Sequence, residues 1–249
     1  MRKQSATQTD RTWPLPDQPY AMRMRWHDLL FAHWPFDAGE VEACLPTNVK
    51  VETYDGQAWI AVVPFHMSDV APRGVPAIPW LSAFPELNIR TYVTFDGKPG
   101  VWFFSLDATN PIAVRVAKLA FHLLYKDARM SIAEREGWFE YSSVRSRTRN
   151  EAPTDFVGRY RPTGEVFHAQ PGTLEHWLTA RYCLYTTDRK GRILRGEIDH
   201  PPWPLQKAEL KIDKNTMFEW LNLEPKGSPH LLFSKFLQVQ AWTNDHVTA

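Results

Sequence analysis

Four tight turns constrain the fold of this chain more than any other feature of its sequence. Each turn is a charged residue followed by glycine, between two runs of β-prone residues: Asp55-Gly56, Asp96-Gly97, Glu136-Gly137 and Lys190-Gly191. Glycine adopts a positive φ without strain, so such pairs favour the short connection of a β-hairpin. We therefore expect a series of strands that pair antiparallel with their neighbours along the chain.

The expected elements follow from these turns and from the proline positions. Strands are expected at 24–34, 49–53, 58–67, 84–93, 101–107, in both halves of 128–149, and at 156–161, 182–186, 192–198 and 230–242. The strands 49–53 and 58–67 are expected to form one hairpin about Asp55-Gly56. Short helices are expected after Asp37, which has capping-box spacing to Glu40, after Asn110-Pro111, and over 172–179.

Many strands and few helices indicate a mainly β fold with a few short helices, in the α+β class. We expect a closed or curved, mainly antiparallel sheet in a single domain over 22–249. Residues 1–21 are polar and carry Pro14, Pro16 and Pro19, which predicts a flexible N-terminal arm. No repeat or linker divides the rest of the chain.

Charge and composition exclude several classes of protein. The formal net charge is +1, so no overall basic surface predicts binding to nucleic acid. No apolar run approaches the roughly 18 residues of a membrane-spanning helix. The two cysteines, Cys44 and Cys183, match no metal or redox spacing and indicate buried thiols in a reducing, cytoplasmic setting. Arg145, Arg147 and Arg149 alternate, as on the solvated edge of a sheet.

The segment FPELNIRTYV, residues 84–93, carries the main functional signal. Alternate side chains of a strand point to opposite faces, which separates two sets. One face would hold Leu87, Ile89 and Val93, and the other Glu86, Asn88, Arg90 and Tyr92. Such a polar row is either a solvated outer face or the inner wall of a polar pocket. The flanking Phe84 and the apolar run 101–104 of the next strand favour the inner wall.

An enclosed polar row would carry chemistry. Burial raises the pKa of a glutamate, so Glu86 is the candidate catalytic acid or base. An enclosed arginine binds carboxylate or phosphate, which makes Arg90 the candidate anion clamp, with Asn88 and Tyr92 as orienting donors. Glu86 and Arg90 lie roughly 13 Å apart along the strand, too far for a direct salt bridge.

Three further residues are candidate ligand contacts. Asp107 and Ser105 share a face of the neighbouring strand and either reach the same volume or satisfy backbone donors where that strand ends. Prolines fix Trp203 within the run His200 to Pro204, as a lid over a pocket or as a plug of the barrel. His66, like His33, is a candidate whose alternative is a hydrogen-bonded structural histidine.

Signatures of common catalytic sites are absent from the sequence. It contains no phosphate-binding loop, dinucleotide fingerprint, GxSxG or HExxH motif. No two histidines have the i, i+4 spacing of helical metal sites. We therefore expect neither a metal nor a cofactor.

Four segments, FPELNIRTYV, FFSLDATNP, RYCLYT and RGEIDHPPWPLQ, resemble the YqjF-like family, a bacterial domain of unknown function (DUF2071). The resemblance covers nearly all of 22–242, and that family is related in fold to acetoacetate decarboxylase. It implies a β-barrel or cone-like double sheet with an internal pocket. The decarboxylase pattern places its Schiff-base lysine in a Phe/Tyr-Pro-Lys-Lys element. Here the matching residues are Phe84-Pro85-Glu86-Leu87, so the resemblance argues against decarboxylation through a lysine imine.

Three hypotheses follow from the sequence. The chain is an enzyme that acts on a small organic acid or carbonyl compound with Glu86 as acid or base. Alternatively it is a non-catalytic binder or sensor of such a ligand, or a structural module in which Glu86 and Arg90 belong to a polar network. The expected partner is a small molecule, with neither nucleic acid nor membrane, and the sequence leaves a homo-oligomer open.

Overall fold

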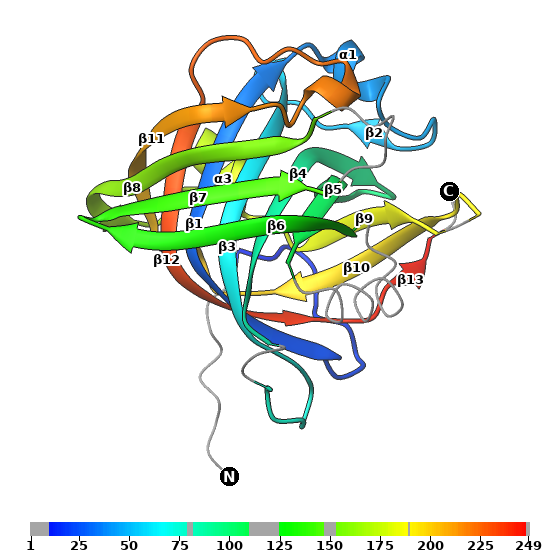
Figure 1. Ribbon diagram of the computed structural model, residues 1–249. Coiled ribbons are helices and arrows are strands. Elements are labelled where there is room, and N and C mark those ends of the chain that lie inside the picture. Colours follow the sequence, from blue (N-terminus) through cyan, green and yellow to red (C-terminus); the bar gives the residue numbers. More distant parts are fainter. Residues whose placement is uncertain (1–9, 79–81, 110–124, 147–152, 189, 248–249) are drawn as a thin grey trace.

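The computed structural model describes residues 10–78, 82–109, 125–146, 153–188 and 190–247. It is a β structure with few helical turns (Figure 1). The strands are β1 (Met22–Phe36), β2 (Lys50–Val51), β3 (Ala58–Pro72), β4 (Phe84–Phe95), β5 (Lys98–Ala108), β6 (Tyr125–Arg135), β7 (Trp138–Arg145), β8 (Asp155–Phe167), β9 (Cys183–Thr187), β10 (Ile193–Asp199), β11 (Leu205–Asn215), β12 (His230–Ala241) and β13 (Asp245–His246). The helices are α1 (Ala38–Glu42), α3 (Leu174–Thr179) and the 3₁₀ turn η1 (Glu219–Leu221).

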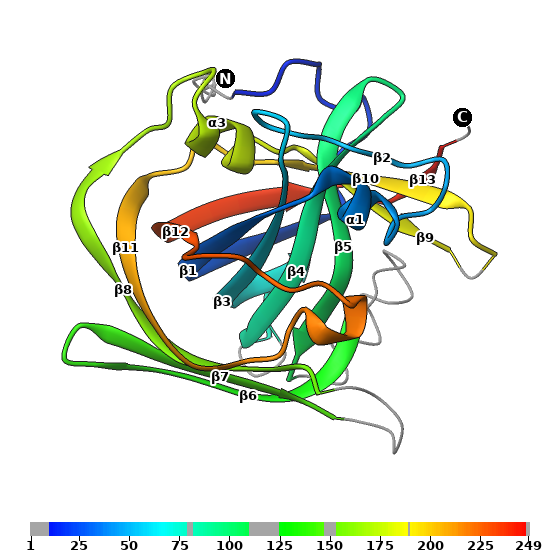
Figure 2. The same ribbon diagram turned by 90° about the horizontal axis from the view of Figure 1, so that it is seen from above.

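Strand pairing closes the sheet into two rings that share strands. The first ring runs from β5 through β6, β7, β8, β11, β12, β1, β3 and β4, and the β4–β5 pairing returns it to β5 (Figure 2). The second ring runs from β5 through β9 and β10 to β12, and returns by the shared strands β1, β3 and β4. All described pairings are antiparallel except β5–β6 and β5–β9. The expected closed, mainly antiparallel fold is confirmed.

Most of the predicted turns lie where the sequence places them. Asp96 and Gly97 have φ values of 50° and 68° and join β4 to β5, and Glu136-Gly137 joins β6 to β7 in the same way. Both residues of such a turn need positive φ, which explains the acidic residue before the glycine.

The hairpin predicted about Asp55-Gly56 is wrong in its pairing. The turn exists and is closed by a bridge between Tyr54 and Gln57, but β2 pairs with β4 instead of β3. The reason is that both edges of β3 are occupied, by β1 on one side and β4 on the other. The chain before the turn therefore lies beyond β4.

Two other differences concern strands of low apolar content. β11 was not predicted, because its charged residues and exposed face resemble a loop, yet it pairs with both β8 and β12. The short β13 follows the strand that the sequence predicts as the last. The helix predicted from Asn110-Pro111 lies outside the described residues.

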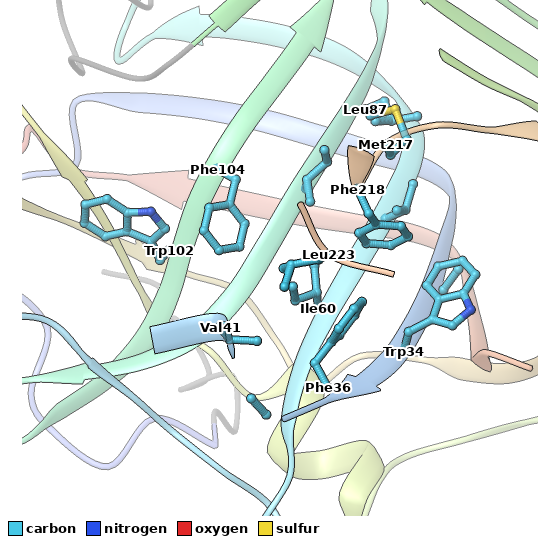
Figure 3. Close-up of a cluster of buried hydrophobic side chains, with 14 of the residues drawn as sticks. Trp34, Phe36, Val41, Ile60, Leu87, Trp102, Phe104, Met217, Phe218 and Leu223 are labelled. Carbon is cyan, nitrogen blue, oxygen red and sulfur yellow. The ribbon is translucent and has the colours of Figure 1, made fainter. Parts of the chain in front are cut away.

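The predicted helix after Asp37 is confirmed as α1. The Asp37 carboxylate accepts hydrogen bonds from the backbone N–H groups of Gly39 and Glu40, as an N-cap does. Val41 is the buried residue of this helix and points toward the interior of the first ring (Figure 3). The second short helix, α3, is capped by Thr173 and packs against the opposite side of the shared strands.

Two hydrophobic cores lie on the two faces of the shared strands. The first core fills the first ring, and its members include Trp34, Phe36, Ile60, Leu87, Phe104, Phe218 and Leu223 (Figure 3). The second core lies on the other face, and its members include Phe31, Trp59, Phe65, Tyr92, Leu178 and Trp203. Consequently β4 is buried on both faces, and its polar side chains lie inside the protein.

The N-terminal residues that are described lie against the second ring. Arg11 donates hydrogen bonds to the Ile198 carbonyl and to Glu197, and Trp13 Nε1 donates to the same glutamate. Trp242 Nε1 donates to the carbonyl of Gln18. Within the described ranges, no helix has the length and apolar character needed to cross a membrane.

Candidate functional site

The polar face of β4 is enclosed by protein. Glu86, Asn88 and Arg90 are 4%, 5% and 8% exposed, and Tyr92 is fully buried. This row of side chains, called the polar wall below, therefore lies inside the protein, and the interpretation of FPELNIRTYV as a solvated outer face is wrong. Their neighbours on this face are the aromatic and aliphatic side chains of the second core.

Glu86 is poised between its two protonation states. Tyr125 Oη donates a 2.7 Å hydrogen bond to Glu86 Oε2, and the Asn88 side chain also bonds this carboxylate. Burial raises the pKa of Glu86 to about 7, although both hydrogen bonds oppose the shift. At neutral pH this carboxyl group can therefore either give or take a proton.

Arg90 is a buried cation without an acidic partner. Its guanidinium lies 5.2 Å from the ring centre of Phe31 and 5.9 Å from that of Tyr92. In the part of the chain that is described, no carboxylate lies within 4.0 Å of Arg90; its side chain bonds the Tyr92 hydroxyl group, and its Nε has no hydrogen-bond acceptor. A buried charge normally has a counter-ion, since desolvation is costly without one.

The sheet register places a small residue beside Arg90. Ala61 of β3 lies directly opposite Arg90, and His33 of β1 lies opposite Ala61 on the other side. Arg90 and His33 thus flank an alanine, the smallest side chain that a strand can place between them. Burial lowers the pKa of His33 well below its usual value, and the charge of Arg90 lowers it further, so this histidine is neutral.

His33 and Tyr92 form a buried pair at this end of the wall. His33 Nε2 lies 2.7 Å from Tyr92 Oη, and a hydrogen bond to the backbone of His230, the residue opposite on β12, also acts on this ring. Among the described residues, the indole Nε1 of Trp59, on β3, has no acceptor. Arg90 thus supplies a free donor on this face, and the indole N–H of Trp59 is a second buried donor on the neighbouring strand.

Trp203 reaches this site through Phe31. Its ring stacks on Trp26 at 5.7 Å and meets the edge of Phe31 at 4.9 Å, and its Nε1 donates to the carbonyl of Thr179. The proline-rich run thus carries Trp203 into the second core, beneath the ring that Arg90 contacts. His200 is buried beside it, and burial lowers the pKa of His200 to about 4.

Arg181 was not identified from the sequence. Its guanidinium lies 4.6 Å from the ring centre of Trp177 and 5.1 Å from that of Tyr92, and it donates two hydrogen bonds to Glu52. It links the end of α3 to the polar wall. In the sequence, Arg181 is recognisable only as an arginine just after a predicted helix. Many solvated arginines occupy such a position, so it did not indicate a site. Tyr125 and Ala61 gave no signal either, since only the sheet register brings them to the site.

Asp107 and Ser105 do not reach the polar face. They lie opposite Leu87 and Ile89, so their side chains point to the first core. The physical reason is an irregularity in the β4–β5 pairing at Ile89 and Arg90, which reverses the faces of the β5 residues beyond it. Of the two alternatives for Asp107, this register does not give a place on the polar face, although the Asp107 charge still helps to raise the pKa of Glu86.

The partner of Asp107 is Arg145, which was predicted to be solvated. Arg145 is instead 9% exposed, and it donates to Asp107 Oδ1 from two nitrogens, at 2.7 and 3.0 Å, and to Ser105 Oγ at 2.7 Å. Alternate residues of β7 point into the first ring, and Arg145 continues that row after Ser143. Arg147 and Arg149 lie outside the described residues.

His66 also lies away from the polar face. It is opposite Pro85, whereas its neighbour Phe65 is opposite Glu86. Successive residues of a strand point to opposite faces, so His66 cannot reach Glu86. Its ring is half-buried and lies 5.9 Å from that of His27, and burial lowers the pKa of both.

The amines that are described lie away from this wall. Lys98 is half-buried and bonds Glu197, and the other described lysines are exposed. Lys118 lies outside the described residues. Over the described ranges, no group of three or more His, Cys, Asp or Glu side chains is arranged to hold a metal ion.

The fold is shared with several solved structures. The enduracididine biosynthesis enzyme MppR, in a complex with pyruvate, has a TM-score of 0.64 and 10% identity over 93% of this chain and 91% of that one. Acetoacetate decarboxylase from Legionella pneumophila has a TM-score of 0.61 and 10% identity over 96% and 93%. At such identities the likeness is one of fold.

Sequence comparison identifies the family. The protein YqjF of Bacillus subtilis, described as uncharacterized, is 42% identical over 229 residues, which cover 92% of this chain and 93% of that protein. The model of the family DUF2071, described as an uncharacterized conserved protein, matches residues 23–238. The chain therefore belongs to the DUF2071 family, whose resemblance the four sequence segments indicate.

Proposed function

We propose that this protein binds a small organic acid on the polar face of β4 and acts on it with Glu86 as general acid or base. The observation that carries the proposal is Arg90, a buried guanidinium with no carboxylate within 4.0 Å among the described residues. Arginine binds carboxylates through charge-assisted hydrogen bonds, so a ligand carboxylate would supply the counter-ion that the protein does not.

The charges around Arg90 favour an anion. Glu86 is about half protonated at neutral pH, and His33 is neutral because of its low pKa. Arg90 is thus the one β4 residue of the wall that is fully charged. The aromatic rings of Phe31 and Tyr92 lie against its guanidinium, in a buried setting where water screens charge weakly. A buried cation of this kind attracts an anion far more strongly than an exposed arginine does.

Glu86 supplies the proton-transfer group. It lies on the same face as Arg90, with Asn88 between them, so a ligand held by its carboxylate at Arg90 would extend along the wall toward Glu86. Its pKa near 7 suits a general acid or base at neutral pH. A glutamate cannot form an imine, so the chemistry proposed here is proton transfer on the bound ligand.

The comparisons add fold-level support. MppR, which shares this fold, was solved with pyruvate bound, so one protein with this architecture holds a small carboxylic acid. Because the identity is 10%, this neighbour supports the size and class of the ligand and no residue role.

A thermal-shift screen against small carboxylic acids tests the binding step. We expect an acid present at 100 times its Kd to stabilise the wild-type protein by about 2.7 kcal/mol. The shift should vanish in Arg90→Met and persist in Arg161→Met, a control in which the arginine is exposed and pairs with Glu209. Equal shifts in both variants, or no shift with any acid, would contradict the proposal.

Turnover of the binding acids tests the role of Glu86. Each acid that gives an Arg90-dependent shift is incubated with the protein and followed by proton NMR, including exchange of carbon-bound hydrogen in D₂O. We expect chemical change or exchange with the wild type and loss of it in Glu86→Gln, which should still bind. Binding without any change or exchange would show a carrier or sensor, and wild-type rates in Glu86→Gln would exclude Glu86 as the acid or base.

A further inference from the structure

Two neighbouring polar atoms of the wall are both without partners, and they have opposite hydrogen-bonding character. Asn88 Oδ1 is an acceptor and Arg90 Nε is a donor, both are buried, and each lacks a partner among the residues described. The two side chains are adjacent on one face of β4, so they could have bonded each other. Neither atom makes a hydrogen bond with the other, and both lie in the interior, where an unsatisfied polar group is costly.

The amide orientation of Asn88 is explained by Glu86. The Asn88 side chain bonds the Glu86 carboxylate and lowers its pKa, which requires the amide N–H to point to Glu86. The amide oxygen is then the group left for a ligand. Nothing except a hydrogen-bond donor can satisfy it.

We propose that the ligand is a short hydroxy acid, whose carboxylate accepts from Arg90 and whose hydroxyl group, one or two carbons away, donates to Asn88 Oδ1. This inference rests on the proposed function, because it takes the Arg90 end as the carboxylate site. It gives the ligand a direction along the wall: the donor of Arg90 meets the acid group, and the acceptor of Asn88 meets the hydroxyl group. A keto acid or an unsubstituted acid leaves the acceptor unmatched.

An amino acid is the alternative donor-bearing ligand, and the charges disfavour it. A buried ammonium would lie beside the Arg90 guanidinium and would need a full negative charge nearby. Glu86 is about half protonated, and one of its oxygens already accepts from Tyr125. A neutral hydroxyl group meets the same acceptor without that cost.

Calorimetric titration with matched acids tests the inference. Lactate, pyruvate, propionate and alanine differ at the second carbon, and 3-hydroxybutyrate and butyrate repeat the comparison one carbon further. We expect at least one hydroxy acid to bind about tenfold or more tightly than its unsubstituted partner, since a site with an unmatched acceptor discriminates against ligands that lack the donor. Alanine and pyruvate should bind no better than propionate.

Variants of Asn88 locate the preference. In Asn88→Leu the ratio between hydroxy acid and unsubstituted acid should fall to about one, while Arg90-dependent binding of the unsubstituted acid persists. In Asn88→Ser, whose hydroxyl oxygen can also accept a hydrogen bond and which brings no charge to Arg90, part of the preference should remain. Far-UV circular dichroism and thermal melting confirm the fold of each variant.

Each result decides a different point. Arg90-dependent binding of all acids without preference for a hydroxyl group would overturn this inference, leave the proposed function standing, and indicate that an ordered water satisfies Asn88. Tighter binding of alanine would also overturn it. Absence of any acid binding would overturn the proposed function and this inference together. The wild-type titrations alone decide the preference for a hydroxyl group, whatever the stability of the Asn88 variants, and Arg90→Met decides the Arg90 dependence.

Discussion

Two buried arginines, Arg145 and Arg90, have opposite surroundings. Arg145 faces the first core and is fully engaged, with two hydrogen bonds to Asp107 and one to Ser105. Arg90 faces the second core, and within the described residues it has aromatic rings around its guanidinium and no carboxylate. The first arrangement is that of a structural ion pair. The second carries a cost in stability that a bound anion would remove.

The two arginines differ in whether the protein itself neutralises their charge. Both arginines come from strands of the first ring, and both would look alike in a list of buried charges. What separates them is the presence of a counter-ion. Polar groups that are satisfied stabilise a fold, and those left unsatisfied in an otherwise well-bonded interior indicate a ligand site.

The largest expected effect belongs to Arg145. Arg145→Met leaves Asp107 as an uncompensated buried carboxylate, so the free energy of unfolding should fall by about 3–5 kcal/mol. Urea unfolding at pH 7 measures this. The double variant Arg145→Met/Asp107→Leu should recover most of the loss, because it removes the stranded charge. A loss below about 1 kcal/mol in the single variant would mean that the pair is not structural and would break the comparison.

The next effect comes from Glu86, the acid on the same face as Arg90. Its pKa is about 7 in the folded protein, against an ordinary value of 4.5, so the unfolded state loses this proton first as the pH rises. The contribution of Glu86 to stability is therefore fully present below about pH 4.5, and roughly 3 kcal/mol of it is lost as the pH rises to about 7.

Glu86→Gln should remove that part of the pH dependence. The unfolding free energies of the wild type and Glu86→Gln are measured in urea from pH 4.5 to 8. The wild type should lose stability relative to Glu86→Gln as the pH rises. A flat difference would show that Glu86 ionises normally, and that it is a permanent negative charge on the face of Arg90.

A smaller effect is expected from Tyr125. Its hydroxyl group donates to the ionised form of Glu86 and so lowers the pKa of that carboxyl group. Tyr125→Phe should move the midpoint of the Glu86 titration to higher pH, at a loss in stability of about 1 kcal/mol. Carboxyl ¹³C chemical shifts report the midpoint, with Tyr54→Phe as the control, because the hydroxyl group of this half-buried tyrosine donates to the Gly172 carbonyl and not to Glu86. An unchanged midpoint would remove Tyr125 from the site.

The smallest effect on stability is expected from Arg90→Met, and it is the most informative test of the difference between Arg90 and Arg145. Arg90→Met leaves no described carboxylate stranded, so the unfolding free energy without ligand should change by less than about 1 kcal/mol or should increase. The same urea experiment as for Arg145→Met gives the answer. A loss of 3 kcal/mol or more would make Arg90 a structural arginine like Arg145 and would support the hypothesis of a purely structural network.

Much of this fold is readable in the sequence because its signals are local. The turns at Asp96-Gly97 and Glu136-Gly137, the cap at Asp37 and the alternation of FPELNIRTYV each depend on a few adjacent residues. That alternation also separated the polar side chains of β4 from the apolar ones. Because both faces of β4 are buried, the polar set lies in the interior. β11 was not predicted, because its charged residues are equally compatible with a solvated strand and with a loop.

The remainder of the site depends on register, which local patterns do not encode. Asp107 does not lie on the polar face, because one irregularity in the β4–β5 pairing reverses the alternation beyond it. Ala61 and Tyr125 enter the site through cross-strand pairing and closure of the rings. Arg145 looked solvated because nothing in its neighbourhood in the sequence reveals Asp107, which lies 38 residues away.

A crystal structure of the protein with the tightest-binding small acid would test the central claim most directly. The account predicts the ligand carboxylate within hydrogen-bond distance of Arg90 Nε, about 2.7–3.2 Å, with its other polar group beside Asn88 Oδ1. Glu86 should lie next to the part of the ligand that would exchange a proton. A ligand bound elsewhere, with Arg90 Nε unchanged or bonded only to water, would contradict the claim that this arginine is held for a ligand.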